Sequence, residues 1–227
     1  MSGTSITANW EQILRSIGNR NVKIVAVSKT HPAERLREAF QAGVRVFGEN
    51  RIQEAVPKIQ ELSVLPIEWH FVGHLQTNKS RDAVRFFSWI HSIDSIRLLQ
   101  HVEKEAAKQS KRMDLLLEIN LGGEESKSGV TEKELPELLE AGRGLSWCTI
   151  CGLMTIPPYL EDVTMARPYF KRLRELQQLY LQEYPQLTEL SMGMSHDYVA
   201  AIEEGATIVR IGTALFGERA SPAQAVI

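Results

Sequence analysis

A single lysine stands at the end of a short apolar run near the start of the chain. Residues 24–27 are uninterrupted strand formers, followed by Ser28 and Lys29 and then by a helical pattern that begins at Pro32. Such a run is typical of a parallel strand buried on both faces, so Lys29 should lie at the rim of a sheet, where α/β proteins bind ligands. A partly desolvated lysine there can attack a carbonyl or aldehyde as an amine nucleophile. The alternative is a solvated lysine at a strand end.

Two segments near the C-terminus could bind an anion. Gly193 lets backbone approach a ligand, and Ser195 stands where it would N-cap the following helix, whose first N–H groups and dipole favour an anion. Gly212 and Thr213 follow the last apolar run and offer further backbone amides and a hydroxyl. Ser195 alone would suit a simple helix cap. Together with Gly212 and Thr213, it favours a phosphate.

Arg210 is the third group that could take part in the chemistry of a site. Alternation along residues 207–211 places Arg210 on the same face as Gly212, so both face the mouth of the sheet if one does. A buried guanidinium needs an acceptor, which could be a carboxylate or a ring nitrogen that the permanent positive charge keeps unprotonated. An amine, an anion site and a partner for a ring nitrogen are together what pyridoxal 5′-phosphate (PLP) requires.

These groups need a scaffold that gathers strand ends at one rim. Strand patterns alternate with helical patterns, which predicts a single α/β domain over residues 1–227, a parallel (β/α)8 TIM barrel. An open doubly wound sheet is the alternative, but it would normally carry a glycine-rich turn after the first strand, and residues 28–32 contain no glycine. The predicted strands cover residues 23–28, 44–47, 67–72, 89–93, 113–120, 147–154, 188–192 and 207–211. The predicted helices cover residues 5–16, 32–42, 51–60, 79–87, 95–110, 131–141, 161–183 and 195–204.

Composition restricts the class of protein. The net charge is −2 and the charges of both signs are interspersed, which argues against a nucleic-acid or membrane-surface role. No stretch approaches the ~20 apolar residues that span a bilayer. The N-terminus lacks the pattern of a signal peptide, so we expect a cytoplasmic protein.

The cysteines and histidines do not predict a metal site. Cys148 and Cys151 lie three apart on a predicted strand, where they should face opposite sides and should therefore form neither a metal site nor a redox pair. His70 and His74 straddle a strand end, which does not favour a metal site either.

Longer motifs resemble the YggS/PROSC family of pyridoxal phosphate homeostasis proteins. The resemblance runs in order over nearly the whole chain and is most specific in residues 69–79 and 191–195. It implies a barrel similar to the N-terminal domain of alanine racemase, with PLP as the cofactor. The cofactor-binding residues that it implies are Lys29 (Schiff base), Ser195, Gly212 and Thr213 (phosphate), Arg210 (pyridine nitrogen), and Asn50, Met154 and Met192 (pocket wall).

The expected function is binding rather than catalysis. Racemase chemistry needs a second base, which alanine racemase takes from an additional C-terminal domain, and an arginine at the ring nitrogen weakens the electron sink of PLP. We therefore expect no catalytic residue, and a carrier, buffer or regulator in vitamin B6 and amino-acid homeostasis. The alternatives are a PLP-dependent amino-acid racemase and a barrel lyase or aldolase. Expected ligands are PLP and free amino acids, the resemblance favours a monomer, and the sequence points to no particular protein partner.

Overall fold

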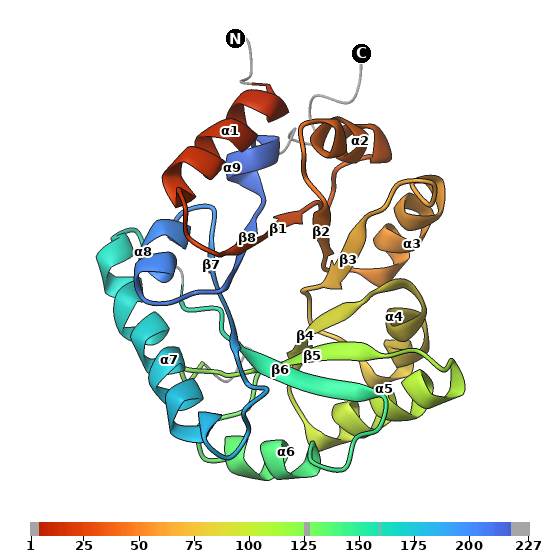
Figure 1. Cartoon of the computed structure of the whole chain (residues 1–227), viewed down its shortest axis with the longest axis vertical. Coiled ribbons are helices and arrows are strands. Elements are labelled where there is room, and N and C mark those ends of the chain that lie inside the picture. Colours follow the sequence, from red (N-terminus) through yellow and green to blue (C-terminus); the bar gives the residue numbers. More distant parts are fainter. Residues whose placement is uncertain (1–4, 125–127, 159, 219–227) are drawn as a thin grey trace.

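The computed structural model describes residues 5–124, 128–158 and 160–218 and confirms the predicted barrel. Each strand pairs in parallel with the next, and the last strand closes the sheet on the first, so the order in space is the order in the chain (Figure 1). The strands are β1 (Lys23–Val27), β2 (Val46–Glu49), β3 (Glu68–Phe71), β4 (Trp89–Ile93), β5 (Met113–Glu118), β6 (Cys148–Met154), β7 (Glu189–Met194) and β8 (Ile208–Ile211).

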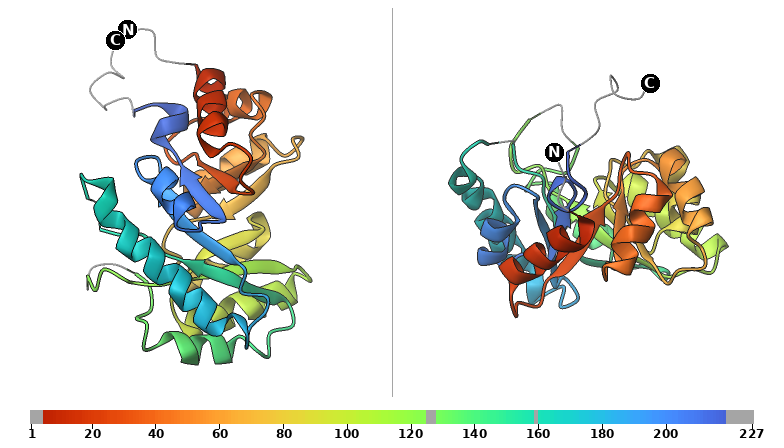
Figure 2. Two further views of the ribbon diagram at one scale, coloured as in Figure 1. Left: turned by 60° about the vertical axis from the view of Figure 1, so that its left-hand side comes forward. Right: turned by 90° about the horizontal axis from the view of Figure 1, so that it is seen from above.

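Helices surround this ring of strands, as the two views of Figure 2 show. Ser5 caps the first helix by accepting a hydrogen bond from the Ala8 N–H, and Ser95 caps the helix after β4 in the same way. The helices are α1 (Ile6–Ile17), α2 (Ala33–Gln41), α3 (Ile52–Glu61), α4 (Ser80–Phe86), α5 (Ile96–Lys108), α6 (Leu135–Ala141), α7 (Arg167–Leu181), α8 (Tyr198–Glu203) and α9 (Thr213–Phe216), and short 3₁₀ turns, η1 (Thr77–Lys79) and η2 (Val163–Ala166), precede α4 and α7.

The apolar side chains form two layers. A large cluster fills the space between the barrel and its helices, and Val209 and Ile211 belong to it. Ile208, from the other face of the same strand, belongs to a small cluster inside the barrel with Val25 and Leu116. Since the inner cluster is small, the rest of the interior is available to polar side chains.

The structure differs from the sequence prediction mainly where turns precede helices. The predicted helix 195–204 begins only at Tyr198, because Asp197 Oδ1 accepts a hydrogen bond from the Met194 N–H at 2.6 Å and holds a turn there. The long helix 161–183 is split into η2 and α7, and the short helix α9 was not predicted.

Two smaller findings bear on the class of protein. Cys148 packs in the outer cluster and Cys151 against the inner one, so the two thiols face opposite sides of β6 as predicted. Within the described ranges, none of the helices has the length and apolar character needed to cross a bilayer, and no three potential metal-ligating side chains come together.

Candidate functional site

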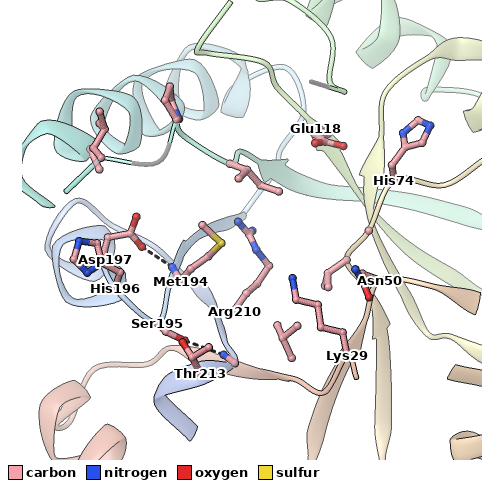
Figure 3. Close-up of a pocket in the computed structure, with 18 of the residues that line it drawn as sticks. Lys29, Asn50, His74, Glu118, Met194, Ser195, His196, Asp197, Arg210 and Thr213 are labelled. Carbon is pink, nitrogen blue, oxygen red and sulfur yellow. Dashed lines mark hydrogen bonds between the residues drawn. The ribbon is translucent and has the colours of Figure 1, made fainter. Parts of the chain in front are cut away.

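A cavity of about 540 Å³ opens at the carboxyl ends of the strands. The side chains and backbone around it come from β1, β5, β7 and β8, from the loops that follow β1, β2, β3, β5, β6 and β7, and from η2 and the start of α9 (Figure 3). Its wall brings together six of the eight predicted site residues, which are Lys29, Asn50, Ser195, Arg210, Gly212 and Thr213.

Lys29 projects into this cavity from the end of β1, and Figure 3 shows its amine turned toward Arg210. A buried ion pair fixes the backbone just before it. Lys58 Nζ donates to Glu49 Oε1 at 2.7 Å and to the Ser28 carbonyl at 2.9 Å, and the Ser28 hydroxyl donates to the same carboxylate. Burial raises the pKa of Glu49 despite the lysine. The end of β1 is therefore held from inside the fold.

The two segments predicted to bind an anion come together at the cavity, although Ser195 acts differently from the expectation. The prediction that Ser195 caps the helix after β7 is wrong, because Asp197 occupies that position. Ser195 Oγ instead accepts hydrogen bonds from the N–H groups of Gly212, at 3.0 Å, and Ala214, at 3.2 Å. It thus ties the loop after β7 to the start of α9. Since the oxygen accepts both bonds, its own proton is available to an acceptor in the cavity.

Arg210 points inward from β8, as the alternation predicts, and is only 4% exposed. Its acceptors in the described part of the chain are a hydroxyl and two backbone carbonyls and not carboxylates. Nη1 donates to the Ser191 carbonyl at 2.9 Å and to Ser191 Oγ at 2.6 Å, and Nη2 donates to the Thr155 carbonyl at 2.9 Å. Burial lowers the pKa of Arg210 to about 10, so it stays charged at neutral pH. Nε and the second N–H of Nη2 have no acceptor in the described part of the chain, which leaves two donors for a ligand.

The two predicted methionines do not line the cavity. Met154 is buried in the small inner cluster, beneath it. Met192 packs in the outer cluster against the helices, so the prediction that it forms the pocket wall is wrong. The pairing of β7 with β8 shifts register between Ser191 and Met194, and Met194 reaches the cavity instead.

The opposite wall carries Glu118, which the sequence did not single out, and His74 from the loop after β3 (Figure 3). Glu118, at the end of β5, is buried and accepts a hydrogen bond from Ser128 Oγ at 3.2 Å. Burial raises the pKa of Glu118. His74 lies beside it and pairs with Asp94 at 3.3 Å. A strand-end carboxylate was the only available signal for Glu118, and an apolar strand with one acidic end is too common to identify a site.

Asn50 reaches the cavity because the backbone beside it is closely packed. A Cβ on Gly73 would lie 2.3 Å from the Asn50 carbonyl oxygen, so only glycine fits at that position. The side-chain oxygen of Asn50 is buried and has no hydrogen-bond partner within the described ranges. Among the described residues, Asn50 thus joins Arg210 in having hydrogen-bonding capacity left for a ligand at this cavity.

Comparison with known proteins places the chain in a family. Residues 2–220 match the family model "Alanine racemase, N-terminal domain". A pyridoxal phosphate homeostasis protein of Aquifex aeolicus is 50% identical over 203 residues, 89% of each chain. Another, from Vibrio cholerae, is 44% identical over 220 residues, 94% of this chain and 93% of the relative. The chain belongs to the pyridoxal phosphate homeostasis protein family.

Solved structures agree with this family assignment. PipY from Synechococcus elongatus, whose structure was determined with PLP bound and again without it, is 42% identical, and the match covers 93% of this chain and all of PipY. The TM-score for PipY with PLP is 0.84. Alanine racemase of Clostridium difficile shares the fold alone, at 15% identity and a TM-score of 0.77, with 96% of this chain matching 58% of that one.

Proposed function

We propose that this protein binds PLP in the cavity at the carboxyl ends of the strands and holds it as a Schiff base on Lys29. The observation that carries the proposal is the convergence of three groups, namely Lys29, the Ser195 and Thr213 hydroxyls, and Arg210, on one cavity. A 42% identical neighbour, PipY, was solved with PLP bound. In this role the protein serves as a carrier, buffer or regulator of intracellular PLP and amino-acid pools.

The residues present suit this cofactor. The amine of Lys29 matches the aldehyde, and the Ser195 hydroxyl with the backbone around Gly212 matches the phosphate. Two donors on Arg210 have no acceptor in the described part of the protein, and a pyridine nitrogen provides one. PLP supplies an aldehyde that forms an imine with amines, and the protein supplies the groups that bind and orient it.

A binding role rather than a catalytic one follows from Arg210. Its guanidinium stays charged at neutral pH, so with PLP bound it would donate a hydrogen bond to the pyridine nitrogen and oppose protonation of that nitrogen. An unprotonated ring withdraws electrons poorly, and removal of an α-proton from a bound amino acid is then slow. We propose further that the protein acts as a monomer in the cytoplasm and that free amino acids are its other small-molecule ligands.

Reduction of the PLP complex with borohydride tests the attachment. We expect a stable adduct on the wild type that peptide mass spectrometry locates at Lys29, and no adduct on Lys29→Ala, which should fold normally because this side chain contributes little packing. The matched control is Lys79→Ala, because Lys79 lines a neighbouring pocket. An adduct that persists in Lys29→Ala would show that PLP is attached to another lysine. Sustained turnover of an enantiopure amino acid that Lys29→Ala abolishes would establish the racemase instead.

A further inference from the structure

A line of hydrogen-bonded side chains crosses the barrel interior to reach Arg210. It begins at Glu68, the first residue of β3, where Oε1 lies 2.7 Å from His70 Nε2. His70 Nδ1 lies 2.9 Å from His91 Nε2 on β4, and His91 Nδ1 lies 2.9 Å from Ser191 Oγ on β7. Ser191 Oγ is the group to which Arg210 Nη1 donates at 2.6 Å. His70, His91 and Ser191 are fully buried and do not line the cavity.

The chemistry of the groups determines where each proton in this line lies. The hydrogen bond from His70 lowers the pKa of Glu68 to about 2, so the carboxylate is ionised and can only accept. His70 must therefore donate from Nε2. Burial lowers the pKa of His70 and takes that of His91 still lower, so both rings are neutral, with one donor and one acceptor nitrogen each. Hence His70 Nδ1 accepts from His91 Nε2, and His91 Nδ1 accepts from the Ser191 hydroxyl.

All these donors point the same way, from Arg210 toward Glu68. Because Ser191 gives its own proton to His91, its oxygen is left to accept from Nη1 of Arg210. Within the described ranges, no carboxylate lies in hydrogen-bond contact with Arg210, and the aligned bonds instead connect its positive charge to the negative charge of Glu68. The line therefore has a cation at the cavity and an anion at the opposite end of the barrel.

We propose that Glu68, His70 and His91 are positioning residues for Arg210. Through Ser191 they fix which N–H groups of the guanidinium are used inside the protein and which face the cavity. They thereby set how strongly Arg210 binds an acceptor placed there. The proposal rests on the proposed function only in naming the pyridine nitrogen of PLP as that acceptor.

A carboxylate that cannot touch the cofactor should then influence it. The other charged groups near the two rings are Lys23, whose Nζ donates to Glu68 Oε1 at 2.9 Å, and Asp114. The chain offers a matched control in Glu189, the first residue of β7, at the same end of the barrel. It accepts a hydrogen bond from Thr207 at 2.6 Å and does not contact the line. Glu68→Gln and Glu189→Gln therefore remove the same charge from the same end.

The first test uses the protein without cofactor. Nitrogen-15 NMR should show both His70 and His91 as neutral rings protonated on Nε2, and Glu68→Gln should shift the Nε–H signal of Arg210 while Glu189→Gln leaves it in place. A ring protonated on Nδ1, or an Arg210 signal that does not respond to Glu68→Gln, would overturn the proposal. If Glu68→Gln does not fold, Lys23→Met is used instead, because it removes the ion pair of the Glu68 carboxylate without changing a residue of the line. A shift of the Arg210 Nε–H signal in that variant supports the proposal, and an unchanged signal overturns it.

The second test adds PLP to the same three proteins. We expect Glu68→Gln to weaken binding by between about 2- and 30-fold, the range that changes along a coupled network produce, and to shift the absorption band of the bound cofactor. Glu189→Gln should behave as the wild type. If PLP binds but the two variants behave alike, the positioning role is refuted and the proposed function stands. If PLP does not bind the wild type, the proposed function fails and the NMR experiment still decides the role of the line.

Discussion

Replacing Ser195 with alanine removes one oxygen that has two separate tasks. In the free protein it accepts hydrogen bonds from the Gly212 and Ala214 N–H groups, which tie the loop after β7 to α9. In the complex with PLP, its hydroxyl would donate to the phosphate. Ser195→Ala should therefore reduce stability and cofactor affinity by different amounts, and the two effects can be measured independently.

The magnitudes follow from the two kinds of bond. Losing an oxygen that caps backbone N–H groups costs about 0.5–2 kcal/mol. For a chain of 227 residues, that is a fall in Tm of roughly 1–8 °C. A hydrogen bond to a charged group contributes about 1.5–3 kcal/mol, or roughly a 10- to 150-fold change in Kd. Because the freed N–H groups of Gly212 and Ala214 can turn toward the phosphate, we expect a loss near the lower end, about tenfold.

Parallel titrations with PLP and with pyridoxal, which lacks the phosphate, separate these effects. Ser195→Ala should weaken PLP binding and leave pyridoxal binding nearly unchanged. Ser128→Ala is the control, because Ser128 lines the same cavity but bonds to Glu118 on the opposite wall. Equal losses for PLP and pyridoxal, or an unchanged Kd for PLP, would show that Ser195 does not bind the phosphate.

Three further predictions concern the fold around the site. Lys58→Met should lower the free energy of unfolding by about 3–5 kcal/mol, because it leaves the Glu49 carboxylate buried without its cation. In urea denaturation, the double variant Lys58→Met with Glu49→Gln should recover part of this loss. No recovery would argue against the ion pair. Gly73→Ala should displace Asn50 and weaken PLP binding, whereas Gly144→Ala, where a Cβ meets nothing within 4 Å, should not. Burial lowers the pKa of both His70 and His91, so the unfolded chain takes up protons there that the folded protein does not, and the free energy of unfolding should fall as the pH decreases below about 6.5. Two histidine signals that titrate with ordinary pKa values in NMR would contradict this last prediction.

The barrel could be predicted from the sequence because its signals are local. Apolar runs, helix caps and the proline and glycine residues between them recur along the chain, and closure of the sheet follows from their number. Lys29, Arg210 and Gly212 were placed correctly for the same reason, since each stands at a fixed offset from a strand that the pattern predicts. The alternation of side chains along β8 then sufficed to predict that Arg210 points inward.

The errors arise where a local rule had a competitor. Ser195 and Asp197 are both good helix caps two residues apart, and the hydrogen bond from the Met194 N–H to Asp197 selects the second. Met192 was expected at the pocket wall from the motif resemblance alone, whereas alternation from the inward Ser191 turns it outward. The register of β7 then shifts beside Gly193, whose φ of +91° few other residues adopt, and Met194 reaches the cavity. The contact between His70 and His91 depends on two strands that lie side by side at a particular height, and no pattern in either strand contains that information.

The pairing of β1 with β8 determines when the site can form during synthesis of the chain. Lys29 ends the first strand and Arg210 lies on the last, and the two strands pair directly, with Val25 opposite Arg210. About 180 residues separate the two side chains, so at a synthesis rate of 5–20 residues per second the lysine leaves the ribosome roughly 10–35 seconds before the arginine. Until then the lysine amine has no guanidinium across from it and no phosphate loop beside it. A growing chain is thus unable to assemble the complete site, which forms only when the barrel closes.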